Sequence, residues 1–311
     1  MSTLGSTKES LLKYRAALVA AGLLWSLGGL FIKSLTANQE WHSSALGITF
    51  YRSLFAALCL APLLRGRKLP RLRDSLVAIL FYTLLLGLYV ASTQGTTAAN
   101  AIFLQYTAPL YAVVLGPLLF KEPFRRADAW ALTLAMLGIA VLFFGNFQGG
   151  AQGPLLMGAG SGLMFGFFLV WLRHMRYADP VAVTAVNNAG VALLSAVALL
   201  CVFPNELTLV PRALLGDARL LPVAAAMALM GCVQIAIPYV LFSYGLKRIP
   251  AVEGSLLSLV EPLLNPVWVA LFIGERPSGA TVVGGLLIVA ALAARYTLFR
   301  STGPPAQPAS P

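Results

Sequence analysis

The sequence predicts an all-α integral membrane protein, with ten transmembrane helices that form two inverted five-helix repeats. Its composition, the spacing of its apolar stretches and an internal repeat of short motifs support this prediction. Of the 311 residues, 59% are hydrophobic and 11% are charged, whereas a soluble domain carries about 25% charged residues. So large an apolar excess cannot be buried in one core, and much of the surface must therefore contact lipid.

Charge and cysteine usage narrow the class of protein further. The formal net charge of +11 would favour a nucleic-acid partner if the protein were soluble. In a membrane protein, basic residues instead hold loops on the cytoplasmic side, so we expect membrane lipid and no nucleic acid as a partner. Cys59, Cys201 and Cys232 lie in apolar stretches and match no metal-binding spacing. We interpret them as small hydrophobic residues, and no metal or cofactor is expected.

Stretches of about 20 apolar residues, enough to cross a bilayer, follow one another along the chain. They cover approximately residues 15–35, 44–64, 74–94, 98–120, 127–147, 153–175, 180–203, 220–245, 250–273 and 278–299. Basic clusters, or Gly, Pro and Asn, separate them. The expected segments are a cytoplasmic tail at 1–14, a first repeat at 15–147, a second repeat at 153–299 and a disordered cytoplasmic tail at 300–311.

The distribution of Lys and Arg predicts the orientation. Basic residues concentrate in the N-terminal tail and in loops such as Arg65–Arg73 and Lys121–Arg126, whereas few, such as Lys33 and Arg276, fall on the other side. Cytoplasmic loops carry the excess of basic residues in membrane proteins. Both termini are therefore predicted to be cytoplasmic.

Short motifs of the first half recur in the same order in the second half, with length changes confined to the loops. Pro109 and Glu122 return 153 residues later as Pro262 and Glu275, and Tyr89 has a counterpart at Tyr239. Five spans are an odd number, so the two copies must be inverted relative to each other. Inverted repeats are typical of transporters, whose substrate site lies at the interface of the repeats, although channels can share this symmetry.

Several of these features resemble the EamA branch of the drug/metabolite transporter superfamily over about residues 15–300. They are the five-plus-five spans, Pro109 and Pro262, and the Gly274-Glu275 ending; Trp25 and Arg52 also fit. Within the branch, the chain is most similar to the YddG-type exporters of aromatic and other neutral amino acids. The resemblance implies a multi-pass protein of the bacterial inner membrane that exports metabolites from the cytoplasm.

Two ionisable residues lie within the predicted spans, where each costs roughly 2.5–3.5 kcal/mol at a helix centre. Glu261 is interpreted either as a cavity group that binds a substrate ammonium or a proton, or as a paired structural carboxylate beside Pro262. Arg52 is interpreted either as a partner for a substrate carboxylate, or as a residue that pairs across helices or extends toward the membrane surface. Ala108 is the repeat counterpart of Glu261, so the symmetry does not require this carboxylate.

Polar and aromatic residues at helical spacing predict the lining of a central cavity. Ser258, Glu261, Asn265 and Trp268 share one face of a span, which should avoid lipid. Tyrosine rings with hydroxyl tips suit neutral amphipathic solutes, although a single Tyr can also anchor the membrane interface. The predicted substrate-binding residues are Tyr82, Tyr89, Gln105, Gln234, Tyr239, Ser258, Glu261, Asn265 and Trp268. Pro109 and Pro262 are predicted hinges, and a static bend is the alternative.

The leading functional hypothesis is a secondary transporter that exports amino acids, or a similar small-molecule metabolite, by alternating access. Export of other metabolites or of lipophilic cations by way of Glu261 is the alternative, followed by a channel. An enzyme is disfavoured, and no catalytic residue is expected, because the chain has only His42 and His174 and no HExxH, GxSxG or Walker signature. Both a monomer and a homodimer fit the sequence.

Overall fold

A computed structural model describes residues 2–38, 41, 43–120, 126–146, 152–175, 177–246, 248–249 and 257–297. All regular elements in these ranges are helices. Glu122, the linker around residue 150 and the predicted tail at 300–311 lie outside the described residues.

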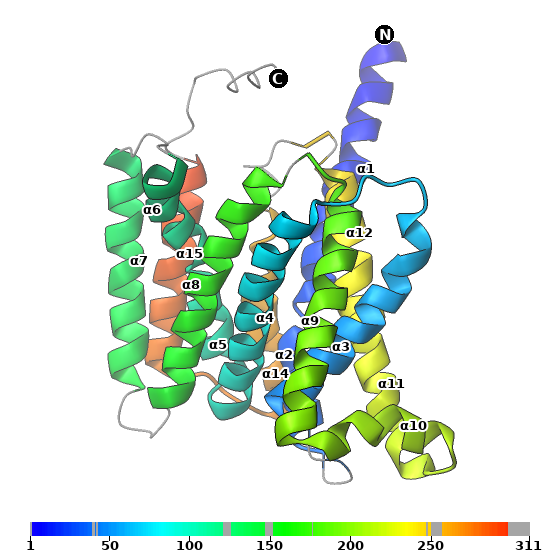
Figure 1. Ribbon diagram of the computed structural model, residues 1–311. Helices are drawn as coiled ribbons and strands as arrows, with labels where there is room; N and C mark the ends of the chain where they lie inside the picture. The colour runs from blue at the N-terminus through cyan, green and yellow to red at the C-terminus, as the bar shows by residue number, and fades with distance from the viewer. Residues whose placement is uncertain are drawn as a thin grey trace.

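The helices follow one another in the order expected for a membrane bundle (Figure 1). The first half contains α1 (Ser2–Trp25), α2 (Gly28–Thr36), α3 (Ala45–Leu60), η1 (Ala61–Leu64), α4 (Leu72–Gly95), α5 (Ala98–Gln105), α6 (Ala108–Phe120) and α7 (Arg126–Gly145). The second half contains α8 (Gln152–His174), α9 (Pro180–Val202), η3 (Pro204–Thr208), α10 (Leu209–Leu214), η4 (Ala218–Leu220), α11 (Leu221–Leu229), η5 (Met230–Ala236), α12 (Ile237–Gly245), α14 (Val260–Ile273) and α15 (Gly279–Thr297).

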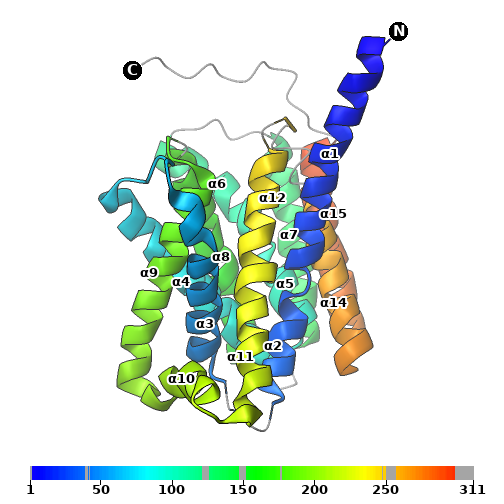
Figure 2. The same ribbon diagram turned by 90° about the vertical axis from the view of Figure 1, so that its right-hand side faces the viewer.

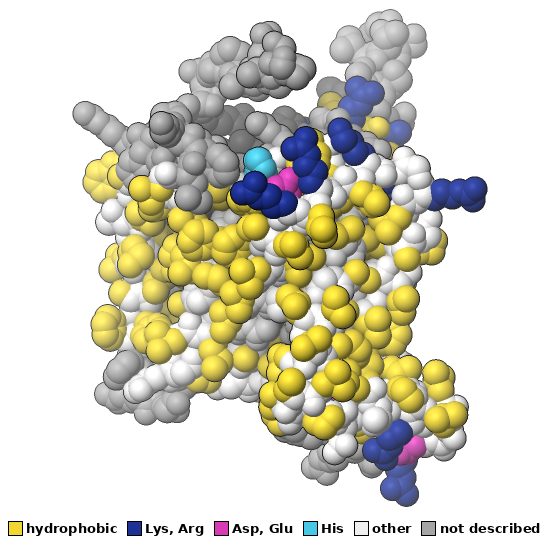
Figure 3. All heavy atoms as spheres, viewed as in Figure 1, with side chains coloured by type: hydrophobic (Ala, Val, Ile, Leu, Met, Phe, Trp, Pro, Cys, Tyr) yellow, Lys and Arg dark blue, Asp and Glu magenta, His cyan; other side chains and the backbone are white. Residues whose placement is uncertain are grey.

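Apolar helices long enough to cross a bilayer dominate the bundle. In the part of the chain that the structure describes, six such spans cover Leu11–Thr36, Ala45–Leu64, Leu72–Gly95, Gln152–Leu172, Pro180–Val202 and Ala218–Gly245. Three shorter apolar helices cover Ala129–Gly145, Val260–Ile273 and Gly279–Ala294. Hydrophobic side chains cover most of the visible face, and Lys and Arg gather near its two ends (Figure 3). This distribution suits a protein with a lipid-facing belt.

Helices from the two halves pack against one another. The most extensive contacts between halves join α4 to α8 and α7 to α15, followed by α3 to α9, and then by α1 to α12 and α6 to α8. Figure 2 shows α1 beside α12 along much of their length. Helix α1 begins and α15 ends at the same end of the bundle, which we call the N-face (Figures 1 and 2). The other end is called the opposite face.

Three of the predicted spans are interrupted. The span expected at 15–35 extends back to Ser2 and breaks between α1 and α2, and the span at 98–120 breaks at Tyr106 and Thr107. The third, at 250–273, has a turn at Ser258 and Leu259 before α14. Pro109 and Pro262 explain the last two breaks, because proline cannot donate a hydrogen bond to the carbonyl four residues earlier.

A different local cause explains the break after α1. The Ser26 hydroxyl donates to the Leu23 carbonyl at 2.6 Å, which competes with the helical hydrogen bonds, and Gly28 and Gly29 follow directly. The segment expected as a loop at 203–219 is also more ordered than predicted, since η3, α10 and η4 lie there.

The interpretation of Cys59 and Cys232 as unpaired hydrophobic residues is wrong, because they form a disulfide. The two residues are 173 positions apart, and their Cα atoms lie 5.8 Å from each other. Packing of α3 against η5 brings them together, a contact that the position of a cysteine in an apolar stretch does not reveal. Cys201 is a free, exposed cysteine.

Candidate functional site

The break between α1 and α2 is the centre of a polar cluster. The Gln234 side chain donates through Nε2 to the Trp25 carbonyl at 3.1 Å. Trp268 donates through Nε1 to the Ser26 hydroxyl at 2.9 Å. The ring of Trp25 meets the ring of Tyr239 edge to face, with centroids 5.2 Å apart. Three residues predicted from the second half of the sequence therefore contact this interruption.

Two glycines let the amide side chains approach α2 closely. A Cβ atom at Gly28 would lie 2.9 Å from Gln234 Nε2 and 3.9 Å from the Tyr89 hydroxyl. At Gly29 an added Cβ would overlap the Asn265 amide. The absence of side chains at these two positions thus creates the space that Gln234 and Asn265 occupy.

Glu261 and Tyr106 form a second part of the cluster. Tyr106 donates its hydroxyl hydrogen bond to Glu261 Oε2 at 2.7 Å, and its oxygen also lies 3.2 Å from the Ser258 carbonyl. That carbonyl is the one that Pro262 cannot use as a helical acceptor. Sequence reasoning missed Tyr106, and the only local signal is its position three residues before Pro109.

Arg52 lies in the middle of α3 and is only 4% exposed. It therefore does not extend toward the membrane surface. Its Nε and Nη1 atoms have no hydrogen-bond partner among the described residues. The guanidinium interacts electrostatically with Glu261 and with the hydroxyl groups of three tyrosines, which are Tyr82, Tyr89 and Tyr239. In the part of the chain that the structure describes, the polar cluster thus contains a buried cation that forms no ion pair and has two nitrogens without a hydrogen-bond partner.

Several buried amide groups also lack partners. In the described part of the chain, the side-chain oxygens of Asn187, Asn188, Gln234 and Asn265, and the Asn265 nitrogen, make no hydrogen bond. An unsatisfied buried group of this kind costs about 1–3 kcal/mol. Such a collection is typical of a binding site, where a polar solute can supply the missing hydrogen bonds.

Of the two remaining predicted residues, Tyr82 belongs to this cluster, whereas the described hydrogen bond of Gln105 is made to α8 instead. Tyr82 stacks on Phe168, with ring centroids 4.9 Å apart, and lies near Tyr239 and Asn188. Gln105 donates to the Ser161 hydroxyl at 3.1 Å and so contacts α8. The structure therefore brings most of the predicted residues together and adds Tyr106 and Asn188 to them.

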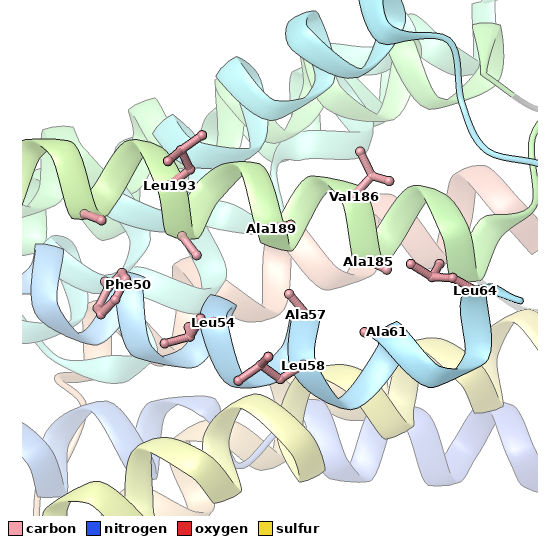
Figure 4. A pocket seen from close by; sticks show the side chains of 12 residues that line it. Phe50, Leu54, Ala57, Leu58, Ala61, Leu64, Ala185, Val186, Ala189 and Leu193 are labelled. Carbon is pink, nitrogen blue, oxygen red and sulfur yellow. The ribbon is translucent and has the colours of Figure 1, made fainter. Parts of the chain in front are cut away.

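A separate groove of about 460 Å³ lies between α3 and α9 (Figure 4). Apolar side chains line it, including Leu54, Ala57 and Ala189. Leu58 and Leu193 on its rim are strongly exposed. This groove suits hydrocarbon and offers no hydrogen bond to a polar solute, so it is distinct from the polar cluster. No group of three or more His, Cys, Asp and Glu residues that could hold a metal ion occurs in the described ranges.

Comparisons with known proteins agree with this architecture. The sequence profile of the EamA-like transporter family matches residues 13–144 and again residues 152–296. An uncharacterized transporter of Archaeoglobus fulgidus is 28% identical over 287 residues, which cover 88% of this chain and 93% of the relative. The threonine/homoserine exporter RhtA of Salmonella typhimurium is 27% identical over 255 residues, or 79% of this chain and 80% of the relative.

A solved crystal structure supports the fold alone, with 21% identity and a TM-score of 0.61 over 92% of this chain and 97% of that chain. The two matches of the family profile together cover most of the sequence. The chain therefore belongs to the EamA-like transporter family and is a multi-pass membrane transporter, not an enzyme.

Proposed function

We propose that this transporter exports amino acids, chiefly neutral ones, from the cytoplasm by alternating access. The YddG-type resemblance of the sequence favours aromatic and other neutral amino acids. The relationship to RhtA, which is named as a threonine/homoserine exporter, supports neutral amino acids with a polar side chain. Both point to a small zwitterion as cargo.

The proposed architecture is a ten-helix inverted repeat in the bacterial inner membrane, with both termini cytoplasmic. Two successive matches to one family profile support the repeat. Packing supports it as well, because the α4–α8 contact has a counterpart in the α12–α1 contact when the halves are exchanged. Basic residues near the N-face, such as Arg67, Lys68, Arg71 and Arg73, support a cytoplasmic location of that end.

One observation carries the proposal: interrupted helices meet at a buried polar cluster. The breaks after Trp25, at Tyr106 and before α14 all contribute contacts to it. Irregular backbone at membrane depth is tolerated where it is buried in protein or lines a cavity, and transporters place substrate sites at such discontinuous helices. In this proposal Pro109 and Pro262 act as hinges, since a half-helix begins next to each.

Counterflow in proteoliposomes tests this function. Purified protein is reconstituted with one unlabelled amino acid inside, and uptake of the labelled amino acid is followed for a panel that includes threonine, homoserine and phenylalanine. Saturable exchange of at least one amino acid is the expected result. Absence of saturable exchange for the whole panel would overturn the proposal. Repeating the assay at two pH values shows whether protons are coupled to transport.

Lipophilic cations are the second candidate cargo. The specific observation in their favour is that the Glu261 carboxylate lies next to Tyr106 and close to the aromatic pair Trp25–Tyr239, because aromatic faces attract cations. Drug-resistance assays in cells that express the wild type and Glu261→Gln discriminate this candidate. Equal resistance from both proteins would argue against it.

A further inference from the structure

We infer that Arg52 and Glu261 bind the two opposite charges of one zwitterionic solute, Arg52 the carboxylate and Glu261 the ammonium group. This inference rests on the proposed transport function and goes further, because it assigns each charge of the cargo to one side chain. It also predicts a requirement: a solute must carry both charges to be transported well.

Burial of an unpaired guanidinium is the first part of the argument. Arg52 lies within a membrane-spanning helix, and its Nε and Nη1 atoms have no partner in the described part of the chain. A buried cation without a direct counter-ion is strongly unfavourable. Its planar fork of donors matches the two oxygens of a carboxylate. A carboxylate-bearing solute would supply both the charge and the hydrogen bonds that Arg52 lacks.

The carboxylate of Glu261 is only partly engaged by the protein. Tyr106 binds Oε2, and the described residues provide no hydrogen bond to Oε1. Glu261 is half-buried, whereas Arg52 is buried. Tyr106 therefore acts as a positioning residue, which holds one oxygen so that the other faces an incoming ammonium group.

The distance between the two charged groups supports a bridging solute. Arg52 and Glu261 interact electrostatically, yet their charged atoms lie beyond the 4.0 Å of an ion pair. Tyr89 and Tyr239 each interact electrostatically with both groups, so both tyrosines lie near the two charges. A buried cation and a half-buried anion that share these tyrosine neighbours without forming an ion pair are arranged as the binding of one zwitterion requires.

A solute with a single charge would satisfy only one of the two groups. An amine would leave Arg52 unpaired, and a carboxylic acid would leave Glu261 without its cation. Sites that bind a polar group reject analogues that lack it, because the buried partner is then left unsatisfied. We therefore expect each singly charged analogue to be exchanged at least about tenfold less efficiently than the amino acid.

The experiment uses matched solutes in the counterflow assay. L-Threonine is compared with 1-amino-2-propanol, which lacks the carboxylate, and with 3-hydroxybutyrate, which lacks the ammonium group. L-Phenylalanine, phenethylamine and 3-phenylpropionate form a second series for the aromatic alternative. The expected result is exchange of the zwitterion in at least one series and weak exchange of both analogues. Equal exchange of an analogue would overturn the inference while leaving amino-acid transport in place; no exchange of any amino acid would instead overturn the proposed function.

Two variants test the assignment of each charge. Arg52→Gln should reduce zwitterion exchange at least about tenfold and leave the amine as the best substrate, whereas Glu261→Gln should favour the carboxylic acid. Arg212→Gln and Asp217→Asn, which alter an exposed ion pair at 3.0 Å, serve as matched controls and should retain wild-type selectivity. Retention of zwitterion preference by both site variants would overturn the assignment. If Arg52→Gln does not fold, Arg52→Lys tests the same assignment. It keeps the positive charge and should therefore still reject the amine.

Discussion

Each end of the bundle carries an ion pair, and the two pairs differ in their exposure to solvent. At the opposite face, Lys33 Nζ lies 2.7 Å from Glu275, and the side chains are 14% and 20% exposed. At the N-face, Arg67 Nη1 lies 2.9 Å from Asp179, and these side chains are 35% and 28% exposed. Solvent screens an exposed pair more effectively. The Lys33–Glu275 pair is therefore expected to contribute more to stability.

The less exposed pair also connects more elements. Lys33 donates to the Thr96 carbonyl at 2.6 Å, and Glu275 Oε1 accepts from the Ala98 amide at 2.7 Å. One ammonium and one carboxylate thus hold together α2, the segment that follows α14 and the turn between α4 and α5. Helices α2 and α14 also meet at Gly29 and Asn265 in the central cluster. The opposite face is therefore held together by an ion pair between segments that adjoin helices which also meet in the candidate site.

Loss of the Glu275 charge should have the largest effect on this comparison. Glu275→Gln retains an oxygen for the Ala98 amide but leaves Lys33 partly buried without its counter-ion. Breaking a fully buried pair costs 3–5 kcal/mol, and partial exposure reduces this, so we expect a loss of about 2 kcal/mol. Thermal unfolding in detergent should show a lower melting temperature.

A double variant separates the unpaired charge from the lost contact. Lys33→Met combined with Glu275→Gln removes both charges, and it should unfold at a higher temperature than Glu275→Gln alone. An unchanged melting temperature for Glu275→Gln would show that the Lys33–Glu275 pair does not contribute more to stability than the exposed pair at the N-face. A double variant that is no more stable than the single one would assign the effect to the hydrogen bonds of Glu275.

Sequence periodicity predicted the apolar spans and one polar helix face of the candidate site, for a definite physical reason. The apolar spans, and the polar face formed by Glu261 and Asn265, are local properties. They can be recognised within the sequence of a single helix. The Tyr106–Glu261 hydrogen bond joins residues 155 positions apart, and the Lys33–Glu275 pair is more distant still. Contacts of this kind depend on how helices pack. The same limit explains the missed disulfide between Cys59 and Cys232.

Helix interruptions were partly predictable. Pro109 and Pro262 mark two breaks, because the missing amide hydrogen is a property of the residue itself. The break at Ser26 has no such marker, since serine often continues a helix with its hydroxyl bonded to a preceding carbonyl. Its position becomes clear only when Trp268 and Gln234 are seen to bind the interrupted segment.

A smaller effect is expected when the contact between Gly29 and Asn265, which connects the opposite face with the candidate site, is altered. Gly29 lies one helical turn before Lys33, and an added Cβ would overlap the Asn265 amide. Gly29→Ala should therefore lower stability by about 1–2 kcal/mol through overpacking, because an amide side chain can shift, and it should also reduce transport because Asn265 is displaced. Melting temperature and counterflow rate are the measurements.

Gly22 provides the matched control for that substitution. A Cβ at Gly22 would meet its nearest neighbours, Leu257 and Val260, at 3.6 Å, which is ordinary van der Waals contact. Gly22→Ala should therefore leave both measurements near the wild-type values. If the two alanine variants behaved alike, helix propensity would explain the result, and the close approach of Asn265 to α2 would not.

The smallest effects are expected at the more exposed pair. Asp179 accepts a hydrogen bond from Arg67 Nη1 at 2.9 Å, and its other oxygen caps α9 by accepting from the Val181 and Ala182 amides. Asp179→Asn removes the charge but keeps a capping oxygen, so it should cost only about 0.2–1 kcal/mol, and this loss should shrink at high salt. Asp179→Ala also removes the cap and should cost about 1 kcal/mol more. Melting temperatures of both variants at low and high salt separate the two contributions. The comparison would fail if Asp179→Asn lost as much stability as Glu275→Gln and if this loss did not depend on salt. Exposure would then not explain how much each ion pair stabilises its end of the bundle.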